Sequence, residues 1–216
     1  MAQVTGHTRR QAPHTKRGVW LEQETVTVEH PAFSQVIEAL AFAAERHRDQ
    51  RRKDPARTPY INHPIALMRV LYLEAGIRDP LVLCAALLHD TVEDTGTTPG
   101  EIEARFGLAV CGVVLEVTDD KRLPKSERKR LQVVHAAGAS EAARMVKLAD
   151  KICNLRDVAT SPPVGWDLER QQAYFDWARE VVDQIRGTHG RLEALFDDAY
   201  AQRPAGDSGT KRVVRT

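Results

Sequence analysis

Apolar positions recur every three or four residues along most of the chain, and no segment alternates convincingly with a period of two. This spacing gives a helix one apolar face, so the pattern predicts an all-α fold. Turn and capping residues between the apolar runs divide the chain into successive helices. We expect them at residues 34–48, 64–76, from 80 onward, from 99 onward, and at 108–117, 125–134, 140–158, 168–186 and 191–202.

Three helix starts are marked by specific residues. Asp79-Pro80 places an N-cap carboxylate before a proline at the first helical position. Thr98 and Glu101 have the three-residue spacing of a capping box. Pro64 is expected at the first position of a further helix. The starts of these helices are therefore predicted more sharply than those of the others.

The most informative segment ends the apolar run 79–88, which is hydrophobic nearly all round and is typical of a central, buried helix. Four ionisable residues follow it: His89, Asp90, Glu93 and Asp94. If the helix continues through them, the pairs four residues apart share one face. Charges at the end of a buried helix are costly unless they are paired or bound to a metal. A His-Asp pair alone is a weak signal, and the apolar context strengthens it.

Two other polar features stand out. His63 lies at an expected helix start beside Pro64, where it could serve merely as an N-cap. Asp150, Asn154 and Asp157 follow one another at positions i, i+4 and i+7 of an otherwise apolar helix. This polar strip is either part of a site or a solvated face.

Length and composition favour a single domain, since 216 residues with 42% hydrophobic content can form one sizeable core. The hydrophobic periodicity begins near residue 30 and ends near residue 202. We therefore expect a flexible N-terminal extension over residues 1–29, a folded domain over residues 30–202 and a basic, disordered tail over residues 203–216.

Charge and cysteine content narrow the class of protein. The formal net charge of +1 argues against general affinity for nucleic acid. No apolar run approaches the roughly 20 residues of a membrane span, and no secretory signal precedes the domain, so we expect a cytoplasmic protein without a membrane partner. Cys84, Cys111 and Cys153 lack the spacing of a metal or redox motif and are expected to be reduced core residues.

The ordered occurrence of His63, His89-Asp90 and Asp150 resembles the H…HD…D pattern of HD-domain metal-dependent phosphohydrolases. The segments around these residues, including 48–55, 58–64, 85–95, 117–121 and 147–151, are similar to the hydrolase domain of RelA/SpoT homologues. They are most similar to the stand-alone small alarmone hydrolases, which include the animal SpoT homologue. The resemblance covers roughly residues 33–202 and implies an HD-domain helical bundle around a mononuclear metal site.

This resemblance implies a ligand set of His63, His89, Asp90 and Asp150. The family implies one Mn²⁺ ion, and a set of two imidazoles and two carboxylates also suits Zn²⁺ or Fe²⁺. Such an ion lowers the pKa of a bound water and polarises a phosphoryl oxygen. Glu93 and Asp94 match the proton-handling pair of the family, and we expect Glu93 to be the main general acid or base.

The resemblance also implies a set of residues that contact the substrate. Cations suit phosphate recognition, and arginine can bind a phosphate through two parallel hydrogen bonds. A solvated charged surface is the alternative for every cation and is favoured for Arg48 and Arg51, while for Tyr174 core packing is equally well supported. The implied contacts are Arg52, Lys53, Lys125, Lys129, Asn154, Arg170 and Tyr174.

The function implied by the resemblance is metal-dependent hydrolysis of guanosine 3′,5′-bis(diphosphate) and its pentaphosphate analogue. The reaction releases the 3′-pyrophosphate and leaves GDP or GTP. Because the sequence ends soon after the hydrolase segment, we expect no synthetase activity. Two alternatives stay open: removal of the 2′-phosphate of NADPH at the same site, and a catalytically silent module that binds the alarmone. The oligomeric state is not predicted.

Overall fold

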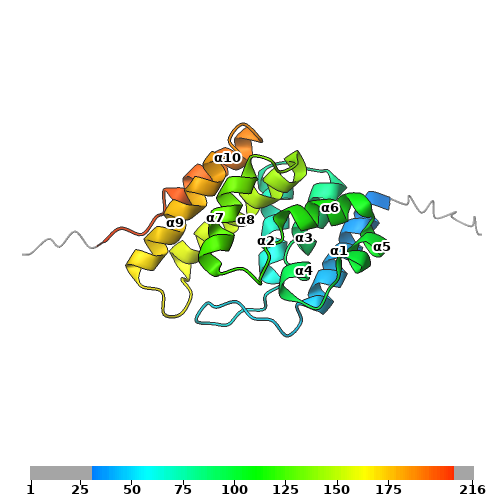
Figure 1. Ribbon diagram of the computed structural model, residues 1–216, viewed down its shortest axis with the longest axis horizontal. Helices are drawn as coiled ribbons and strands as arrows, with labels where there is room; N and C mark the ends of the chain where they lie inside the picture. Colours follow the sequence, from blue (N-terminus) through cyan, green and yellow to red (C-terminus); the bar gives the residue numbers. More distant parts are fainter. Residues whose placement is uncertain (1–30, 207–216) are drawn as a thin grey trace, which may run out of the picture.

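The structure is a computed structural model that describes residues 31–206, so the expected N-terminal extension and residues 207–216 of the expected tail lie outside it. Within this range the regular structure is helical, apart from one isolated bridge between Arg51 and Pro59. The predicted all-α fold is confirmed (Figure 1). The elements are α1 Pro31–Arg46, α2 Asn62–Arg69, the π-helical turn η1 Val70–Glu74, α3 Pro80–Leu88, α4 Thr91–Asp94, α5 Pro99–Phe106, α6 Leu108–Val117, α7 Lys125–Ala136, α8 Glu141–Thr160, α9 Leu168–Asp183 and α10 Gly190–Tyr200.

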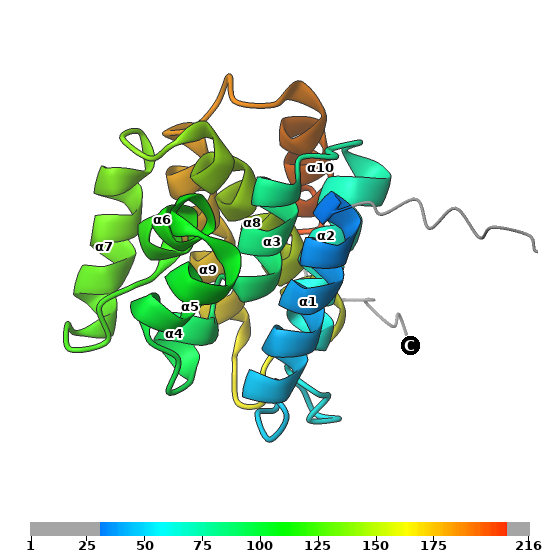
Figure 2. The ribbon, with the colours of Figure 1, turned by 90° about the vertical axis from the view of Figure 1, so that its right-hand side faces the viewer.

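Helix α3 forms the centre of the core, as its uniformly apolar sequence predicts. Its residues from Val82 to Leu88 are all buried. The helix packs against α1, α2, α6 and α8, and Figure 2 shows it in the middle of the molecule. The three cysteines are buried free thiols, in agreement with their predicted place in the core. Because α3 is surrounded by other helices, residues at its C-terminal end are held inside the protein.

The capping signals are borne out at two helix starts. The Asp79 side chain accepts a hydrogen bond from the Leu81 backbone N–H, and Thr98 and Glu101 form a reciprocal capping box. Helix α2 differs from the prediction, because it begins at Asn62 rather than at Pro64. The proline is tolerated there because the first four N–H groups of a helix have no partner within it.

The expected continuation of α3 through Asp94 is wrong. Helix α3 ends at Leu88, and a separate short helix, α4, begins at Thr91. Between them Asp90 adopts φ −100° and ψ −2°. The His89 ring and the Thr91 hydroxyl bind the carbonyl oxygens of Ala86 and Leu88, so side chains replace backbone donors at the end of the helix. The ionisable segment therefore does not form one continuous helix with α3.

The last described residues lie against α9. Arg203 forms an ion pair of 2.8 Å with Asp176, and the Pro204 carbonyl accepts a hydrogen bond of 2.8 Å from Gln172. The first part of the expected tail is thus in contact with the domain. In the part of the chain that the structure describes, no helix combines the length and hydrophobicity needed to cross a membrane.

Candidate metal centre and adjoining cavities

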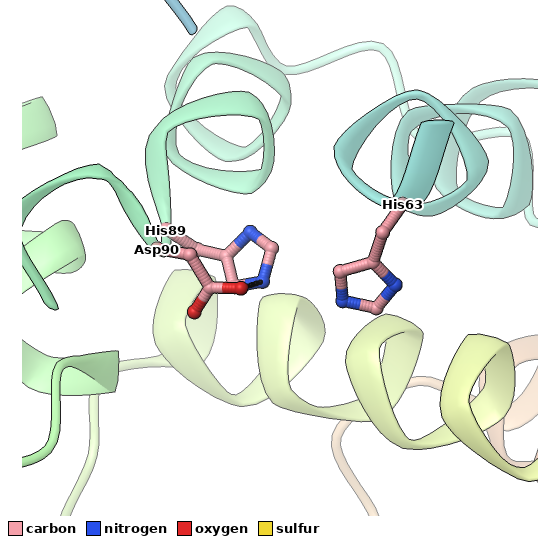
Figure 3. A group of neighbouring side chains, drawn as sticks. All are labelled: His63, His89 and Asp90. Atoms are coloured by element: carbon pink, nitrogen blue, oxygen red, sulfur yellow. Dashed lines mark ion pairs between the residues drawn. The ribbon is translucent and has the colours of Figure 1, made fainter. Parts of the chain in front are cut away.

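The four residues predicted to bind a metal meet at one point in the interior. His63 comes from the first turn of α2, His89 and Asp90 from the α3–α4 junction, and Asp150 from α8. Ligand atoms of His63, His89 and Asp90 lie within 4.8 Å of one another (Figure 3). Asp150 joins them, because its Oδ1 lies 3.2 Å from Nε2 of His63. The two histidines are buried and the two carboxylates are about one-fifth exposed.

The orientation of His89 makes this group suitable for a cation. Its Nδ1 lies 2.8 Å from the Ala86 carbonyl, which can only accept, so Nδ1 carries a proton and donates. Nε2 then faces Asp90 Oδ2 at 2.9 Å and is buried without a hydrogen-bond partner. Two electron-rich atoms this close require positive charge between or upon them. The mixed nitrogen and oxygen donors fit a divalent metal ion.

The pKa values of His89, Asp90 and Asp150 also indicate that this group of side chains attracts positive charge. Burial lowers the pKa of His89, but the close, negatively charged Asp90 and the charge of Asp150 outweigh burial and raise the pKa to about 9. Burial opposes ionisation of Asp90 and Asp150, yet nearby cationic groups lower the pKa of both: His89 acts most strongly on Asp90, and Lys151 on Asp150. Both carboxylates are therefore ionised and attract either a proton or a metal ion.

Other side chains hold the two carboxylates in place. The Tyr60 hydroxyl donates to Oδ2 of Asp90. Asn154 Nδ2 donates to Oδ1 of Asp150 at 2.5 Å, and Lys151 Nζ lies 2.9 Å from Oδ2. Such partners orient metal ligands and tune their affinity. Sequence reasoning did not find Tyr60 or Lys151, although both stand close to predicted ligands in the chain.

Glu93 faces the same cavity as the four candidate ligands. Its Oε2 accepts a hydrogen bond of 3.0 Å from the Asp119 backbone N–H, and Arg128 lies 3.4 Å from Oε1. Burial raises the pKa of Glu93 to about 7, and the charges of Asp90, Asp119 and Asp94 act in the same direction. The Asp119 N–H only partly offsets this effect. At neutral pH this carboxylate can therefore exchange a proton readily.

Asp94 occupies a different position from Glu93. It lies on the wall of a neighbouring cavity, where Gln50 donates to its Oδ2 at 2.8 Å and Lys121 pairs with its Oδ1. The two residues of the predicted proton-handling pair therefore face different spaces. Only Glu93 lines the cavity that contains the candidate ligands.

Two connected spaces make up the site. The inner cavity, of about 190 Å³, is lined by the four candidate ligands and Glu93. The outer cavity, of about 740 Å³, lies beside it and is lined largely by the segment 50–60 and by residues near 154–166. Four residues belong to the walls of both cavities: Arg52, Tyr60, Asn154 and Tyr174.

Three predicted substrate contacts lie at this boundary. Arg52 donates to Asp157 Oδ2 at 2.5 Å and to Asn154 Oδ1 at 3.3 Å. Asn154 also binds Asp150, so it links the outer wall to the candidate ligands. Tyr174 lines both cavities and packs against Trp177, which means that its expected roles in the core and at the nucleotide site are compatible. A fourth predicted contact, Lys53, lines the outer cavity alone.

The other three predicted cations surround an aromatic cluster on α9 and the loop before it. Lys129 Nζ lies 4.5 Å from the centre of the Trp177 ring, and burial together with neighbouring cations lowers its pKa to about 8. Lys125 and Arg170 lie 5.9 Å and 4.7 Å from the Trp166 ring. Neither lysine is on the wall of the inner or the outer cavity. Trp166 lines the outer cavity and was not predicted from the sequence.

Two cations that we expected to be solvated are indeed exposed. Arg48 forms surface pairs with Glu45 and Asp49. Arg51 is exposed as well, although it contributes to the rim of the outer cavity. Lys147 was missed: it is buried beside the inner cavity, and burial lowers its pKa to about 8. Nothing in its local sequence distinguishes it from a surface lysine of an amphipathic helix.

Comparisons with known proteins agree with this geometry. The HD domain family model matches residues 39–175. A curated guanosine-3′,5′-bis(diphosphate) 3′-pyrophosphohydrolase, MESH1 of Xenopus tropicalis, is 58% identical over 165 residues, which are 76% of this chain and 92% of that protein. The MESH1 of Homo sapiens is 56% identical over 170 residues, or 79% and 95% of the two chains. A solved structure of a metazoan SpoT orthologue that hydrolyses ppGpp superposes with a TM-score of 0.76 at 52% identity, covering 79% of this chain and 96% of that one.

Proposed function

The chain belongs to the HD domain family, and we propose that it hydrolyses guanosine 3′,5′-bis(diphosphate) and its pentaphosphate analogue to GDP or GTP and pyrophosphate. The observation that carries this proposal is the meeting of His63, His89, Asp90 and Asp150 with Glu93 in one small cavity. That cavity adjoins a larger one whose wall carries four cations, Arg51, Arg52, Lys53 and Lys121, beside three aspartates. This combination suits hydrolysis of a polyphosphorylated nucleotide.

The four candidate ligands would hold one divalent ion, for which we propose Mn²⁺. Zn²⁺ and Fe²⁺ are alternatives, because they accept the same nitrogen and oxygen ligands. Such an ion would lower the pKa of a bound water and polarise a phosphoryl oxygen. Tyr60, Asn154 and Lys151 keep the two ligand carboxylates in position before any ion arrives.

Glu93 is the proposed general base. Its pKa of about 7 leaves a large fraction ionised at neutral pH, and its place in the inner cavity lets it accept the proton of the attacking water. The Asp119 N–H and Arg128 restrain the carboxylate, one at each oxygen. For Asp94 we propose a supporting role, because it lines the outer cavity rather than the one that contains the candidate ligands, and Gln50 and Lys121 bind its oxygens.

The sizes of the two cavities suggest how the substrate is divided between them. Typical small-molecule pockets have volumes of about 300–1,000 Å³, so the outer cavity suits a nucleotide and the inner one admits only part of it. We place the 3′-pyrophosphate at the inner cavity, with Arg52 at the boundary. The remainder of the nucleotide would contact Lys53, Asn154 and Tyr174, with Lys125, Lys129 and Arg170 as further phosphate or ribose contacts.

The decisive experiment incubates the purified protein with the alarmone and Mn²⁺ and follows pyrophosphate release. NADPH is assayed in parallel for phosphate release from its 2′ position. We expect a higher kcat/KM for the alarmone. A preference for NADPH would reassign the substrate, and binding of the alarmone without turnover would indicate a silent binding module. The cytoplasmic location expected from the sequence stays a prediction.

A further inference from the structure

A continuous series of hydrogen bonds connects a candidate metal ligand with the proposed general base. Asp150 Oδ2 accepts from Lys151 Nζ at 2.9 Å, and the same ammonium donates to Gln132 Oε1 at 3.0 Å. Gln132 Nε2 donates to Asp119 Oδ2 at 2.8 Å, and the Asp119 N–H donates to Glu93 Oε2 at 3.0 Å. Every hydrogen bond in this series joins one donor to one acceptor.

Gln132 is the member that spans the two halves. It lies on α7, is half-buried and reaches the wall of the inner cavity. Its amide uses the oxygen toward the ammonium of Lys151 and the nitrogen toward the carboxylate of Asp119. A glutamine amide suits this position because it offers an acceptor and a donor on separate atoms. Lys151 is 4% exposed, so its ammonium depends on such partners.

The same face of α7 carries a second link to the general base. Arg128 Nη1 lies 3.4 Å from Glu93 Oε1 and 3.9 Å from Asp119 Oδ2. It therefore restrains the carboxylate that the Asp119 N–H already binds. Helix α7 thus contacts Glu93 directly through Arg128 and indirectly through Gln132 and Asp119.

The geometry points to Gln132 as a positioning residue for the reaction, a role that rests on the proposed function of Asp150 and Glu93. Through Lys151 it holds the metal-binding carboxylate, and through Asp119 it holds the general base. It thereby keeps the two at a constant separation. Gln132 itself touches neither the substrate nor the reacting atoms in this role.

The test uses the full-length protein with Gln132→Met, which has a similar shape and neither hydrogen bond. Loss of a partner that orients a ligand typically weakens metal binding or activity by about 10- to 100-fold. We expect the Kd for Mn²⁺, measured by calorimetry, to rise within that range. We expect kcat to fall at least about tenfold with KM changed less than about threefold, because both groups act on the reacting phosphate.

Gln35→Met is the matched control, since Gln35 is also half-buried in a helix and donates to a single backbone oxygen, that of Phe106. It should lower thermal stability without changing the Mn²⁺ affinity or kcat. If Gln132→Met behaves in the same way, with a lower Tm but normal metal affinity and kcat, Gln132 is merely structural and the proposal is overturned.

Gln132→Glu tests the contact with Lys151 and the contact with Asp119 separately, and it remains informative if the methionine variant fails to fold. It keeps the acceptor for Lys151 but places a carboxylate against Asp119. We therefore expect near-normal Mn²⁺ affinity with a reduced kcat. Normal values of both would contradict the positioning role. Because Mn²⁺ affinity is measured without substrate, this readout stands even if the wild-type protein does not hydrolyse the alarmone.

Discussion

The inner and outer cavities share four wall residues but are built in different ways. The inner cavity takes its ligands from α2, from the α3–α4 junction and from α8, and its histidines are buried. The outer cavity is lined mainly by loop residues, and its cations Arg51 and Lys53 are exposed. Packing of the core therefore positions the residues of the inner cavity, whereas the exposed side chains of the outer cavity keep more conformational freedom.

This difference predicts how each cavity contributes to the rate. Preorganised polar groups in a protected space stabilise charge that develops in the transition state, so they act on kcat. Exposed cations bind phosphates before and during the reaction, which changes KM more than kcat. Helix α8 passes through both environments, with Asp150 at the inner cavity and Asp157 two turns later at the outer one.

The largest effect is expected from Asp150→Asn. The change removes one of two ligand carboxylates and should eliminate both bound metal and turnover. We expect kcat to fall by more than about 10³-fold, which exceeds the loss caused by removing a single group that stabilises the transition state electrostatically. Metal analysis and steady-state kinetics measure it, and chelation followed by added Mn²⁺ should abolish and restore the wild-type activity. Asp157→Asn is the matched control on the same helix and should retain the metal. Full turnover by metal-free protein would refute the assigned chemistry.

Glu93→Gln comes next in size. It should lower kcat by about 10²- to 10⁴-fold while metal content, fold and KM are retained, because the amide preserves shape and cannot accept a proton. The wild-type rate should rise with pH around a midpoint of about 7, the pKa of Glu93, and level off above it, since only the carboxylate acts as a base. The variant should lose this rise. A normal kcat would assign the proton transfer to Asp94 or to solvent.

The sequence predicted the inner cavity better than the outer one, for a physical reason. The candidate ligands and Glu93 stand in short motifs, whose order along the chain carries the resemblance to HD-domain phosphohydrolases, and that resemblance implied their roles. Local chemistry alone locates the helix starts at Asp79 and Thr98, and the apolar run before His89 predicts a buried helix. Periodicity and capping rules do not by themselves bring together residues as distant in the chain as His63 and Asp150.

What the sequence did not reveal depends on contacts between distant segments. The interruption at Asp90 follows from side chains that bind backbone carbonyls, which helix periodicity does not encode. Gln132 meets its partners across 13 and 19 residues, and Arg52, although expected to contact the substrate, meets Asp157 across 105. From its position in the sequence alone, Gln132 would be interpreted as a surface residue of an amphipathic helix. The partners of both residues become known only when the helices are packed.

An intermediate effect is expected at the boundary between the cavities. Arg52→Ala removes a cation that touches both spaces and should lower kcat/KM for the alarmone by about 10- to 150-fold, mainly through KM, as expected for the loss of a charge-assisted contact worth about 1.5–3 kcal/mol. Arg51→Ala, at the exposed rim, is the control and should change kcat/KM by less than about threefold. A fall in kcat at constant KM would instead indicate that Arg52 stabilises the transition state, as expected for residues of the inner cavity.

The smallest expected effect is a dependence of KM on pH that arises at Lys129. Burial and the charges of Lys125 and Lys151 lower the pKa of Lys129 to about 8, so the ammonium is lost as the pH rises through that value. A polyanionic substrate favours the charged form, and KM should therefore increase by about tenfold between pH 7 and pH 9.

Lys129→Arg keeps its charge over this range and should give a KM that does not change with pH, while Lys129→Met should give a uniformly high KM. Lys147 also has its pKa lowered to about 8 but lies at the inner cavity, so Lys147→Met should leave the rise in KM intact. An unchanged rise in Lys129→Arg would show that a different group controls the dependence of substrate binding on pH.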